Sequence, residues 1–188
     1  MTLHLIALGA NSGATRAANA RKVARAACAL RAVFGPSVRV SALYATPAWP
    51  PGIGPEFVNA AACVSSHLSP KAVLTRLHRI EARFGRTRSV RWGARVLDLD
   101  LIGSDGLVRP DGPTVRGWMH LAETAQGISA PDHLVLPHPR VQDRGFVLIP
   151  MADVAPGWRH PITGRSIGAM AAGLSVAARR GIRRLHPI

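Results

Sequence analysis

The order of strands and helices expected in the first hundred residues constrains the fold of this chain more than any other feature. Period-two and helical patterns follow one another in the order β-α-β-β-α-β. The segments are residues 3–8, 15–34, 38–45, 57–64, 69–84 and 96–102. This is the split-βαβ order, which is typical of an antiparallel sheet with helices packed on it. We therefore expect an α+β, ferredoxin-like fold, built as a single-domain α/β sandwich.

The remaining residues carry weaker signals. We expect a short helix within residues 115–126, a short strand at 145–149 and a terminal helix at 167–180. Prolines and glycines shape the loops at 46–55 and 137–140, because proline fixes its own φ and restricts its predecessor. No internal repeat or linker divides the 188 residues, so we expect one domain.

Charge and cysteine usage limit the possible partners and compartments. The formal charge is +14, and all but two of the 24 basic residues are arginine. Such a surface is either simply solvated or suited to an anionic ligand, such as nucleotide phosphates or nucleic acid. Cys28 and Cys63 lie in apolar runs without a CxxC motif, which favours a reducing compartment. Because neither a signal peptide nor an apolar run of 18 residues is present, we expect a cytoplasmic protein without membrane contact.

One strand pattern carries two carboxylates. Leu97, Leu99 and Leu101 alternate with Asp98 and Asp100, which predicts a strand with one apolar and one polar face. The two aspartates then leave the same face with Cα atoms roughly 7 Å apart. Like charges this close favour a bound cation, and oxygen ligands favour Mg²⁺. The alternative is a solvated strand face that carries charges.

Arginines surround this strand pattern in the sequence. They are Arg86, Arg88, Arg91 and Arg95, with Arg144 further along the chain. Guanidinium groups bind phosphate oxygens in a bidentate manner, so carboxylates for Mg²⁺ and arginines for phosphate together suit phosphoryl-type transfer. The alternative is a solvated basic loop.

Two smaller constellations are candidate binding groups. His138 lies between Pro137 and Pro139, which hold it stiffly near Arg140. Phe57 and Asn59 leave the same face of a strand, where a ring and a carboxamide could recognise a planar heterocycle. Read alone, each also fits an ordinary turn or core residue.

Several motifs of other enzyme folds are absent. Lys22 and Lys71 are the only lysines and neither follows a glycine, so the chain has no Walker A loop. It has no GxGxxG or HExxH motif either. A P-loop enzyme and a protein kinase are therefore excluded.

Six ordered motifs together resemble the 6-hydroxymethyl-7,8-dihydropterin pyrophosphokinase family. They are Leu8-Gly9-Ala10-Asn11, residues 41–47 (SALYATP), Phe57-Val58-Asn59-Ala60, Ile80-Glu81 before residues 85–88 (GRTR), residues 91–100 (RWGARVLDLD), and residues 137–140 (PHPR) before 144–148 (RGFVL). The resemblance covers residues 3 to about 156.

The resemblance implies a reaction and a set of roles. ATP would give its β,γ-pyrophosphoryl group to the hydroxymethyl oxygen of the pterin and release AMP, with two Mg²⁺ ions held by Asp98 and Asp100. The implied catalytic residues are Arg86, Arg95, Asp98 and Asp100. The implied ATP-binding residues are Glu81, Arg86, Arg88, Trp92, Arg95, Leu101, His138 and Arg144. The implied pterin-binding residues are Thr46, Pro47, Phe57, Asn59 and Phe146, with the two phenylalanines on either side of the ring.

The chain departs from the family pattern at several points. Ala10 replaces a common serine, and Ala94 stands where proline is common. His78 stands where a glutamine that contacts ATP is common. An insertion is expected at about residues 109–132, which include Trp118 and His120.

Two other classes remain as alternatives. A nucleic-acid-binding module of ferredoxin-like topology would account for the charge but not for two aspartates on a central strand. A catalytically inactive homologue is the other. We expect a monomer with small-molecule substrates, ATP and 6-hydroxymethyl-7,8-dihydropterin, and no nucleic acid.

Overall fold

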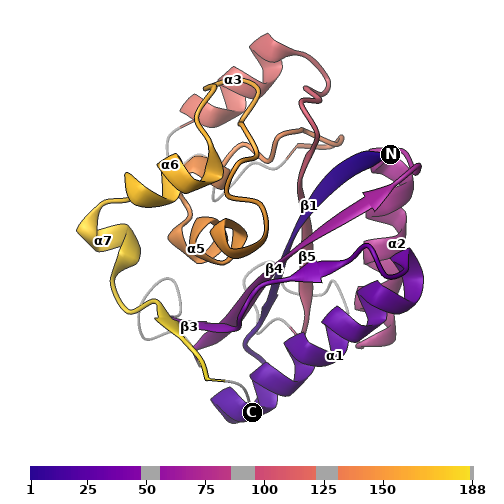
Figure 1. The fold of residues 1–188 in the computed structure, drawn as a ribbon, viewed down its shortest axis with the longest axis vertical. Coiled ribbons are helices and arrows are strands. Elements are labelled where there is room, and N and C mark those ends of the chain that lie inside the picture. The colour runs from indigo at the N-terminus through magenta and orange to yellow at the C-terminus, as the bar shows by residue number, and fades with distance from the viewer. Residues whose placement is uncertain (48–55, 86–95, 122–130, 187–188) are drawn as a thin grey trace.

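A six-stranded antiparallel sheet forms the centre of the described part of the chain. The computed structural model describes residues 1–47, 56–85, 96–121 and 131–186 (Figure 1). The strands are β1 (Thr2–Ala10), β2 (Arg39–Val40), β3 (Tyr44–Thr46), β4 (Phe57–Ser66), β5 (Asp98–Ser104) and β6 (Arg183–Arg184). Their order is β5-β1-β4-β3-β6, and β2 also pairs with β4. The first four of these positions follow the split-βαβ topology, so the predicted fold class is confirmed.

Two long helices, α1 (Arg16–Phe34) and α2 (Pro70–Arg83), cover one face of this sheet. Both begin where capping residues predict: the Thr15 hydroxyl accepts the Ala18 N–H, and the Ser69 hydroxyl accepts the Ala72 N–H. Their apolar sides pack on the sheet in one cluster of buried residues. It includes Val23, Leu30, Leu77 and Ile80 from the helices and Ile6, Leu8, Val58, Leu97, Leu99 and Leu101 from the sheet segments.

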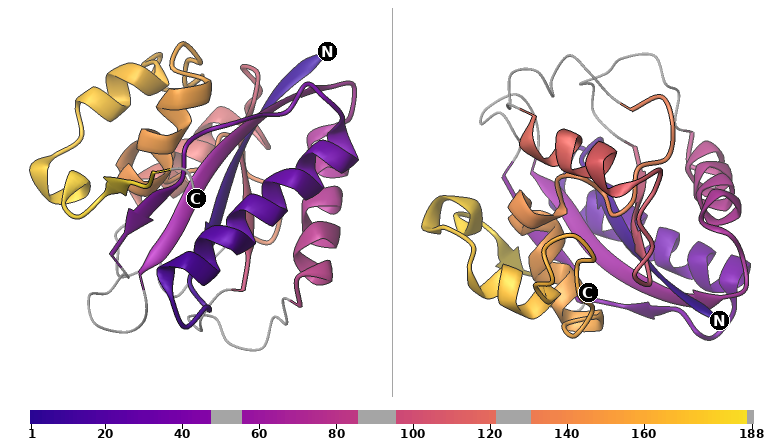
Figure 2. Two further views of the ribbon diagram at one scale, coloured as in Figure 1. Left: turned by 60° about the horizontal axis from the view of Figure 1, so that its bottom comes forward. Right: turned by 90° about the horizontal axis from the view of Figure 1, so that it is seen from above.

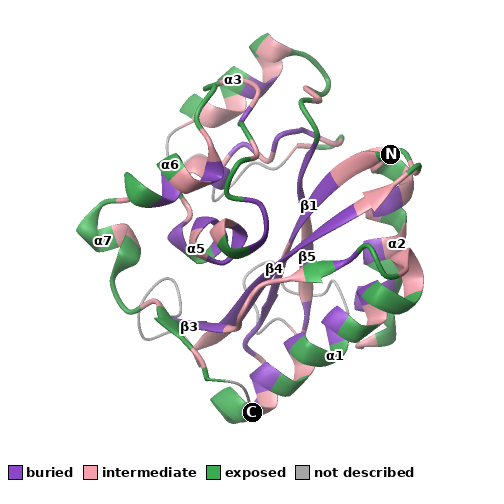
Figure 3. Ribbon diagram, in the orientation of Figure 1, coloured by how far each residue is buried: buried purple, intermediate pink, exposed green. Residues whose placement is uncertain are grey.

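The other face carries a second layer, formed by α5 (Gly145–Val154) and α6 (Ile167–Ala172). Leu5, Ala61 and Ile102 of the sheet pack there against Leu148 and Met151 of α5. Figure 2 shows the sheet between the α1–α2 layer and the orange and yellow C-terminal helices. Burial is concentrated in the central strands and on the inner sides of the helices (Figure 3).

The strand expected at residues 145–149 is wrong, because these residues begin helix α5. Its buried residues Val147, Leu148, Met151 and Val154 recur at spacings of three and four, which is the helical period. A five-residue apolar run is too short to reveal that period, so its sequence fits a strand equally well.

Three other expected elements differ in their bounds. The terminal helix expected at 167–180 is broken into α6 and α7 (Val176–Arg179), because Gly173 ends the first and Ser175 caps the second. The helix α3 (Gly112–His120) starts earlier than expected, since the Asp111 carboxylate accepts the Thr114 N–H as an N-cap. The expected strand at 38–45 is divided into β2 and β3. A 3₁₀ turn, Val141–Asp143, precedes α5.

The described ranges contain no helix that is both long and apolar enough to cross a membrane. Arg109 and Leu136 are the two ends of an excursion of the chain between β5 and α5, of which residues 109–121 and 131–136 are described. Its two ends are joined, because Arg109 and Leu136 exchange backbone hydrogen bonds of 2.8 and 3.0 Å.

Candidate active site

The two aspartates lie on the sheet face that also carries α5 and α6. Along β5, Asp98 and Asp100 are half-buried, whereas Leu99 and Leu101 between and after them are buried against the α1–α2 layer. The predicted alternation of faces is therefore confirmed. Both carboxylates leave the strand on the same side, where a cation can neutralise them.

Strand register places Asn59 in the same row as Asp98. On β1, Gly9 pairs with Asp98 of β5 on one side and with Asn59 of β4 on the other. A Cβ atom at Gly9 would lie 2.7 Å from Asn59 Oδ1, closer than two such atoms can approach. Glycine at this position thus leaves the space that the Asn59 carboxamide occupies. The sequence motif contains Gly9, but only the register shows what it does.

The Asn59 carboxamide is held from β3. Its Nδ2 donates to Thr46 Oγ1 at 2.8 Å, and both side chains are almost fully buried. Phe57 lies two residues before Asn59 on the same face and is half-buried. Four of the five residues that the resemblance assigns to the pterin therefore come from β3, β4 and the residue after β3; Pro47 follows Thr46 and is exposed.

Phe146, the fifth of them, lies in the first turn of α5. Its side chain is 40% exposed, which is unusual for a phenylalanine and leaves the ring available to a ligand. The Arg144 guanidinium carbon lies 5.6 Å from the centre of this ring. Arg144 and Phe146 thus form a cationic and aromatic pair at the start of α5.

His138 and Arg144 form a pair of hydrogen-bond donors. His138 Nδ1 accepts the backbone N–H of Arg140 at 3.1 Å, and the backbone N–H of His138 donates to Ile102 O of β5 at 2.8 Å. Burial lowers the pKa of His138 to about 3, and the neighbouring Arg144 and Arg140 add to this effect. Because Nδ1 accepts, the neutral imidazole carries its proton on Nε2, so the 3.4 Å approach of Arg144 Nη1 to Nε2 places two donors side by side and is not a hydrogen bond between them. Two N–H groups side by side suit an anionic oxygen.

Glu81 and Leu101 both have structural roles in the fold. Glu81 on α2 is almost fully buried, and its Oε1 accepts the Leu99 N–H at 2.8 Å. This bond ties α2 to β5 between the two aspartates. The Leu101 side chain is buried in the core against α1 and α2. A contact of either residue with ATP stays a prediction.

Several predicted residues lie outside the described part of the chain. They are Arg86, Arg88, Arg91, Trp92, Ala94 and Arg95. Of the other departures from the family pattern, Ala10 is buried at the end of β1 and His78 is exposed on α2.

The donor set at the aspartates fits magnesium. Asp98 and Asp100 offer carboxylate oxygens, and the described residues contain no group of three or more His, Cys, Asp or Glu arranged for a metal. Mg²⁺ usually binds through one or two carboxylates together with water and substrate phosphates. A pair of carboxylates without a full protein cage is therefore the expected protein share of such a site.

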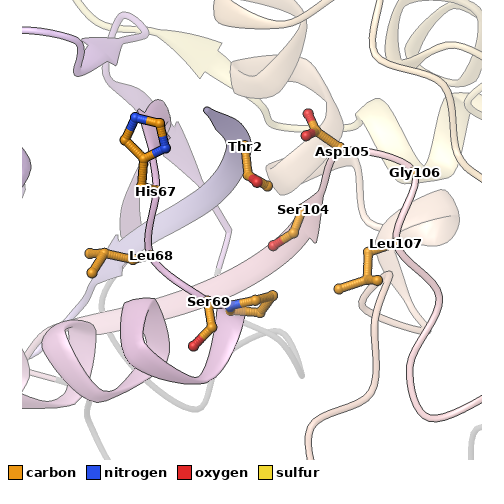
Figure 4. Close-up of a pocket in the computed structure, with 9 residues that line it drawn as sticks. Thr2, His67, Leu68, Ser69, Ser104, Asp105, Gly106 and Leu107 are labelled. Carbon is orange, nitrogen blue, oxygen red and sulfur yellow. The ribbon is translucent and has the colours of Figure 1, made fainter.

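A separate cavity of about 520 Å³ lies at the far end of the sheet (Figure 4). Thr2 and Ser104, at the opposite ends of β1 and β5 from Gly9 and Asp98, line it together with His67, Ser69 and Asp105. Thr2 and Gly9 are seven positions apart along β1, which corresponds to roughly 23 Å. None of the predicted site residues lines this cavity, so it is distinct from the candidate active site.

The fold and the site together define a class of protein. A carboxylate pair suited to magnesium, a His–Arg pair suited to phosphate and a buried carboxamide with Phe57 beside it on the same strand lie on one face of a ferredoxin-like sheet. This combination belongs to enzymes that transfer phosphate-containing groups.

Comparison with known proteins identifies the family. The profile of the family described as 7,8-dihydro-6-hydroxymethylpterin-pyrophosphokinase (HPPK) matches residues 5–156. The chain belongs to this family, the pterin pyrophosphokinases of folate biosynthesis. The resemblance found in the sequence is thereby confirmed.

Curated relatives are named as pterin pyrophosphokinases. A 2-amino-4-hydroxy-6-hydroxymethyldihydropteridine pyrophosphokinase of Methylorubrum extorquens is 35% identical over 159 residues, which are 83% of this chain and 84% of the relative. The enzyme of that name from Pseudomonas aeruginosa is 36% identical over 150 residues, 79% of this chain and 76% of the relative.

Solved structures share the fold. An HPPK-DHPS in complex with substrates superposes with a TM-score of 0.70 at 13% identity and covers 100% of this chain. The Plasmodium falciparum HPPK-DHPS A437G with pteroate superposes with a TM-score of 0.64 at 12% identity and covers 97% of this chain. This chain spans about half the length of these two solved chains, 47% and 46%.

Proposed function

We propose that this chain transfers the β,γ-pyrophosphoryl group of ATP to the hydroxymethyl oxygen of 6-hydroxymethyl-7,8-dihydropterin and releases AMP. The family supports the reaction class. The observation that carries the proposal is the row Asp98–Gly9–Asn59 across three strands, because it brings a cation-binding group beside a carboxamide that can read a heterocycle.

The nucleotide would lie on the side of His138 and Arg144. The Nε2–H of neutral His138 and the guanidinium of Arg144 would donate to phosphate oxygens. Asp98 and Asp100 would hold two Mg²⁺ ions. When bound, these ions would compensate the charge of the triphosphate and lower the pKa of the attacking hydroxyl. Phosphoryl-type transfer mainly requires positioning and charge compensation, and the residues present are suited to both.

Further contacts with ATP are proposed from the resemblance. Arg86 and Arg95 would lie nearest the transferred phosphates and act as catalytic residues together with the aspartates. Glu81, Arg88, Trp92 and Leu101 would complete the nucleotide site.

The pterin would lie on the side of Asn59. Thr46 accepts one of the two N–H groups of Asn59 Nδ2, which fixes the orientation of the carboxamide. The carboxamide would bind the amide edge of the pterin, while Phe57 and Phe146 stack on its two faces. Pro47 would close the pocket from the end of β3. The substrate hydroxymethyl group would then point along the row towards Asp98.

We also propose the finer properties expected from the sequence. The protein would act in the cytoplasm as a single-domain monomer, without nucleic acid as a partner. Residues 109–132 would be an insertion in the family fold, and the joined ends of the 109–136 excursion support this.

Product analysis by ion-exchange chromatography tests the proposed reaction. With ATP, the pterin and Mg²⁺, we expect AMP and pterin diphosphate in equal amounts. Omission of the pterin or addition of EDTA should stop both products, and added Mg²⁺ should restore them. Formation of ADP instead of AMP, or no turnover with both substrates and Mg²⁺ present, would contradict the proposal.

A further inference from the structure

The segment of residues 175–185, called here the C-terminal strap, lies beyond residues 5–156 that the family profile matches. It consists of helix α7, a turn at Gly181 and strand β6. The Ser175 hydroxyl accepts the Ala178 N–H and starts α7. In Figure 1 the yellow strap leaves α6 and reaches the edge of the sheet beside β3.

The strap extends the sheet at β3, the strand that leads into the proposed pterin pocket. Arg184 pairs with Tyr44, and Arg183 pairs with Ala45. The Leu185 N–H donates to Leu43 O at 2.8 Å. The backbone of β3 just before Thr46 is therefore held between β4 on one side and the strap on the other.

The turn of the strap lies directly against Pro47. Gly181 has a φ of +75°, and a Cβ atom there would lie 2.6 Å from Pro47 Cγ. The strap backbone can come this close to the proline ring only because residue 181 lacks a side chain.

A charged contact joins the strap to the start of β4. Arg183 Nη2 lies 2.5 Å from Glu56 Oε1, and Arg16 Nε lies 3.2 Å from Glu56 Oε2. Glu56 directly precedes Phe57, so the strap and α1 both hold the residue next to this aromatic ring.

The strap also packs on the start of α5. A Cβ atom at Gly145 would lie 2.2 Å from Ala178 O and 3.1 Å from Ile182 Cδ1. Gly145 directly precedes Phe146. The strap therefore contacts Pro47, the neighbour of Phe57 and the neighbour of Phe146.

We infer that the C-terminal strap is a positioning element of the pterin pocket, which fixes the two phenylalanines and Pro47 relative to one another. This inference rests on the proposed function for the identity of the ligand. The strap acts through its neighbours and contacts no reacting atom. Displacement of its turn from Pro47 should therefore weaken pterin binding much more than ATP binding, because a Cβ atom at Gly181 would meet Pro47 but neither His138 nor Arg144.

A matched pair of glycine variants tests this inference. Gly181 and Gly164 both have positive φ, +75° and +68°, but a Cβ atom at Gly164 would meet nothing within 4 Å. Gly181→Ala and Gly164→Ala therefore share the backbone strain, and only the former pushes the strap from Pro47. We expect Gly181→Ala to raise the KM for the pterin about five-fold or more over Gly164→Ala, with kcat and the KM for ATP within about two-fold.

A second pair of variants replaces arginines of the strap and keeps its glycine. Arg183→Ala removes the ion pair with Glu56, whereas Arg180→Ala removes an exposed charge from the same strap. Because the Arg183–Glu56 pair is partly exposed, we expect only about a two- to three-fold rise in the pterin KM for Arg183→Ala and none for Arg180→Ala.

Equal pterin KM values for Gly181→Ala and Gly164→Ala would overturn the inference, as would an equal rise in the KM for ATP. Failure of the proposed function shows differently, as an inactive wild-type chain. In that case, hydrogen exchange of residues 43–47 and 56–59 decides whether the strap holds this region. Exchange there must be faster in Gly181→Ala than in Gly164→Ala, and equal exchange contradicts the strap's positioning role.

Discussion

Asn59 Nδ2 donates a hydrogen bond of 2.8 Å to Thr46 Oγ1 and thereby joins the side chains of two adjacent strands in a nearly dry environment. The pairing of Tyr44 with Asn59 and of Thr46 with Phe57 brings the two side chains to the same region of the sheet. A buried carboxamide with one fixed donor keeps its oxygen and second N–H in a defined direction, which suits recognition of a heterocycle edge.

Loss of the Thr46 hydroxyl should lower both stability and pterin affinity. Thr46→Val keeps the shape but leaves a buried N–H of Asn59 without its acceptor, which costs about 1–3 kcal/mol. We expect urea denaturation to show this loss, and the KM for the pterin to rise while the KM for ATP is unchanged. Thr75→Val is the control, because the Thr75 hydroxyl donates to Lys71 O at an exposed position of α2. Equal stability of the two variants would contradict the structural role of the Asn59–Thr46 bond.

The small size of Gly9 should be necessary for the pterin site. Gly9→Ala places a Cβ atom 2.7 Å from Asn59 Oδ1, so the carboxamide must turn or the strands must separate. We expect the KM for the pterin to rise about ten-fold or more, measured by steady-state kinetics with ATP saturating. In Gly106→Ala, the added atom meets nothing within 4 Å, so this variant should behave like the wild type. Unchanged pterin kinetics in Gly9→Ala would show that Asn59 does not hold the substrate.

The aspartates should be essential for magnesium-dependent turnover. Asp98→Ala or Asp100→Ala removes half of the protein oxygen donors proposed for the ions, so kcat should fall by about three orders of magnitude or more. Asp132→Ala, which removes an exposed carboxylate at the surface, should leave kcat unchanged. A magnesium titration of each variant is the measurement. Near wild-type kcat in either active-site variant would exclude the proposed metal role.

Stability should fall as the solution becomes acidic. Burial lowers the pKa of His160 below its ordinary value of 6.5, and the same holds for buried His4. When the pH falls below about 6.5, the unfolded chain therefore binds protons that the folded chain does not, and the free energy of unfolding decreases. This stabilising contribution is fully present above pH 6.5 and is lost as the pH falls towards the lowered values.

Replacement of His160 isolates part of this effect. His160 Nδ1 accepts the N–H groups of Ile162 and Thr163, and an asparagine oxygen can take over both bonds. We expect the free energy of unfolding of His160→Asn, measured by urea denaturation, to change less between pH 7.5 and pH 5 than that of the wild type. His186→Asn, at an exposed position, is the control, and its free energy of unfolding should change with pH as that of the wild type does. If the free energy of unfolding of His160→Asn changes with pH as much as that of the wild type, His160 does not contribute to the acid sensitivity.

Elements whose apolar residues recur with a clear period could be predicted from the sequence. Alternation at residues 97–101 revealed the two faces of β5, and the stripe of Val73, Leu77 and Ile80 revealed the buried side of α2. Helix α5 could not be predicted, because the apolar run of residues 145–149 has no period of its own. The second layer on the sheet was therefore predicted only in part, since the terminal helix expected at 167–180 contains α6.

The candidate site was predictable as a set of residues but not as an arrangement. The position of Asn59 beside Gly9 and Asp98 depends on the register of three strands that are distant in the sequence. The approach of His138 Nε2 to Arg144 Nη1 depends on the path of the chain through a 3₁₀ turn. Neither arrangement leaves a signal in the local sequence pattern, and the same holds for the contact of Gly181 with Pro47.

Strand β6 has one more consequence, for the handling of this protein. β3 would otherwise present a row of open N–H and C=O groups, and unpaired sheet edges promote aggregation between molecules. The two arginines of β6 cover that edge and oppose further strand addition by their charge. A shortened version that stops at residue 156, where the family match ends, would expose this edge and should precipitate or form oligomers during purification.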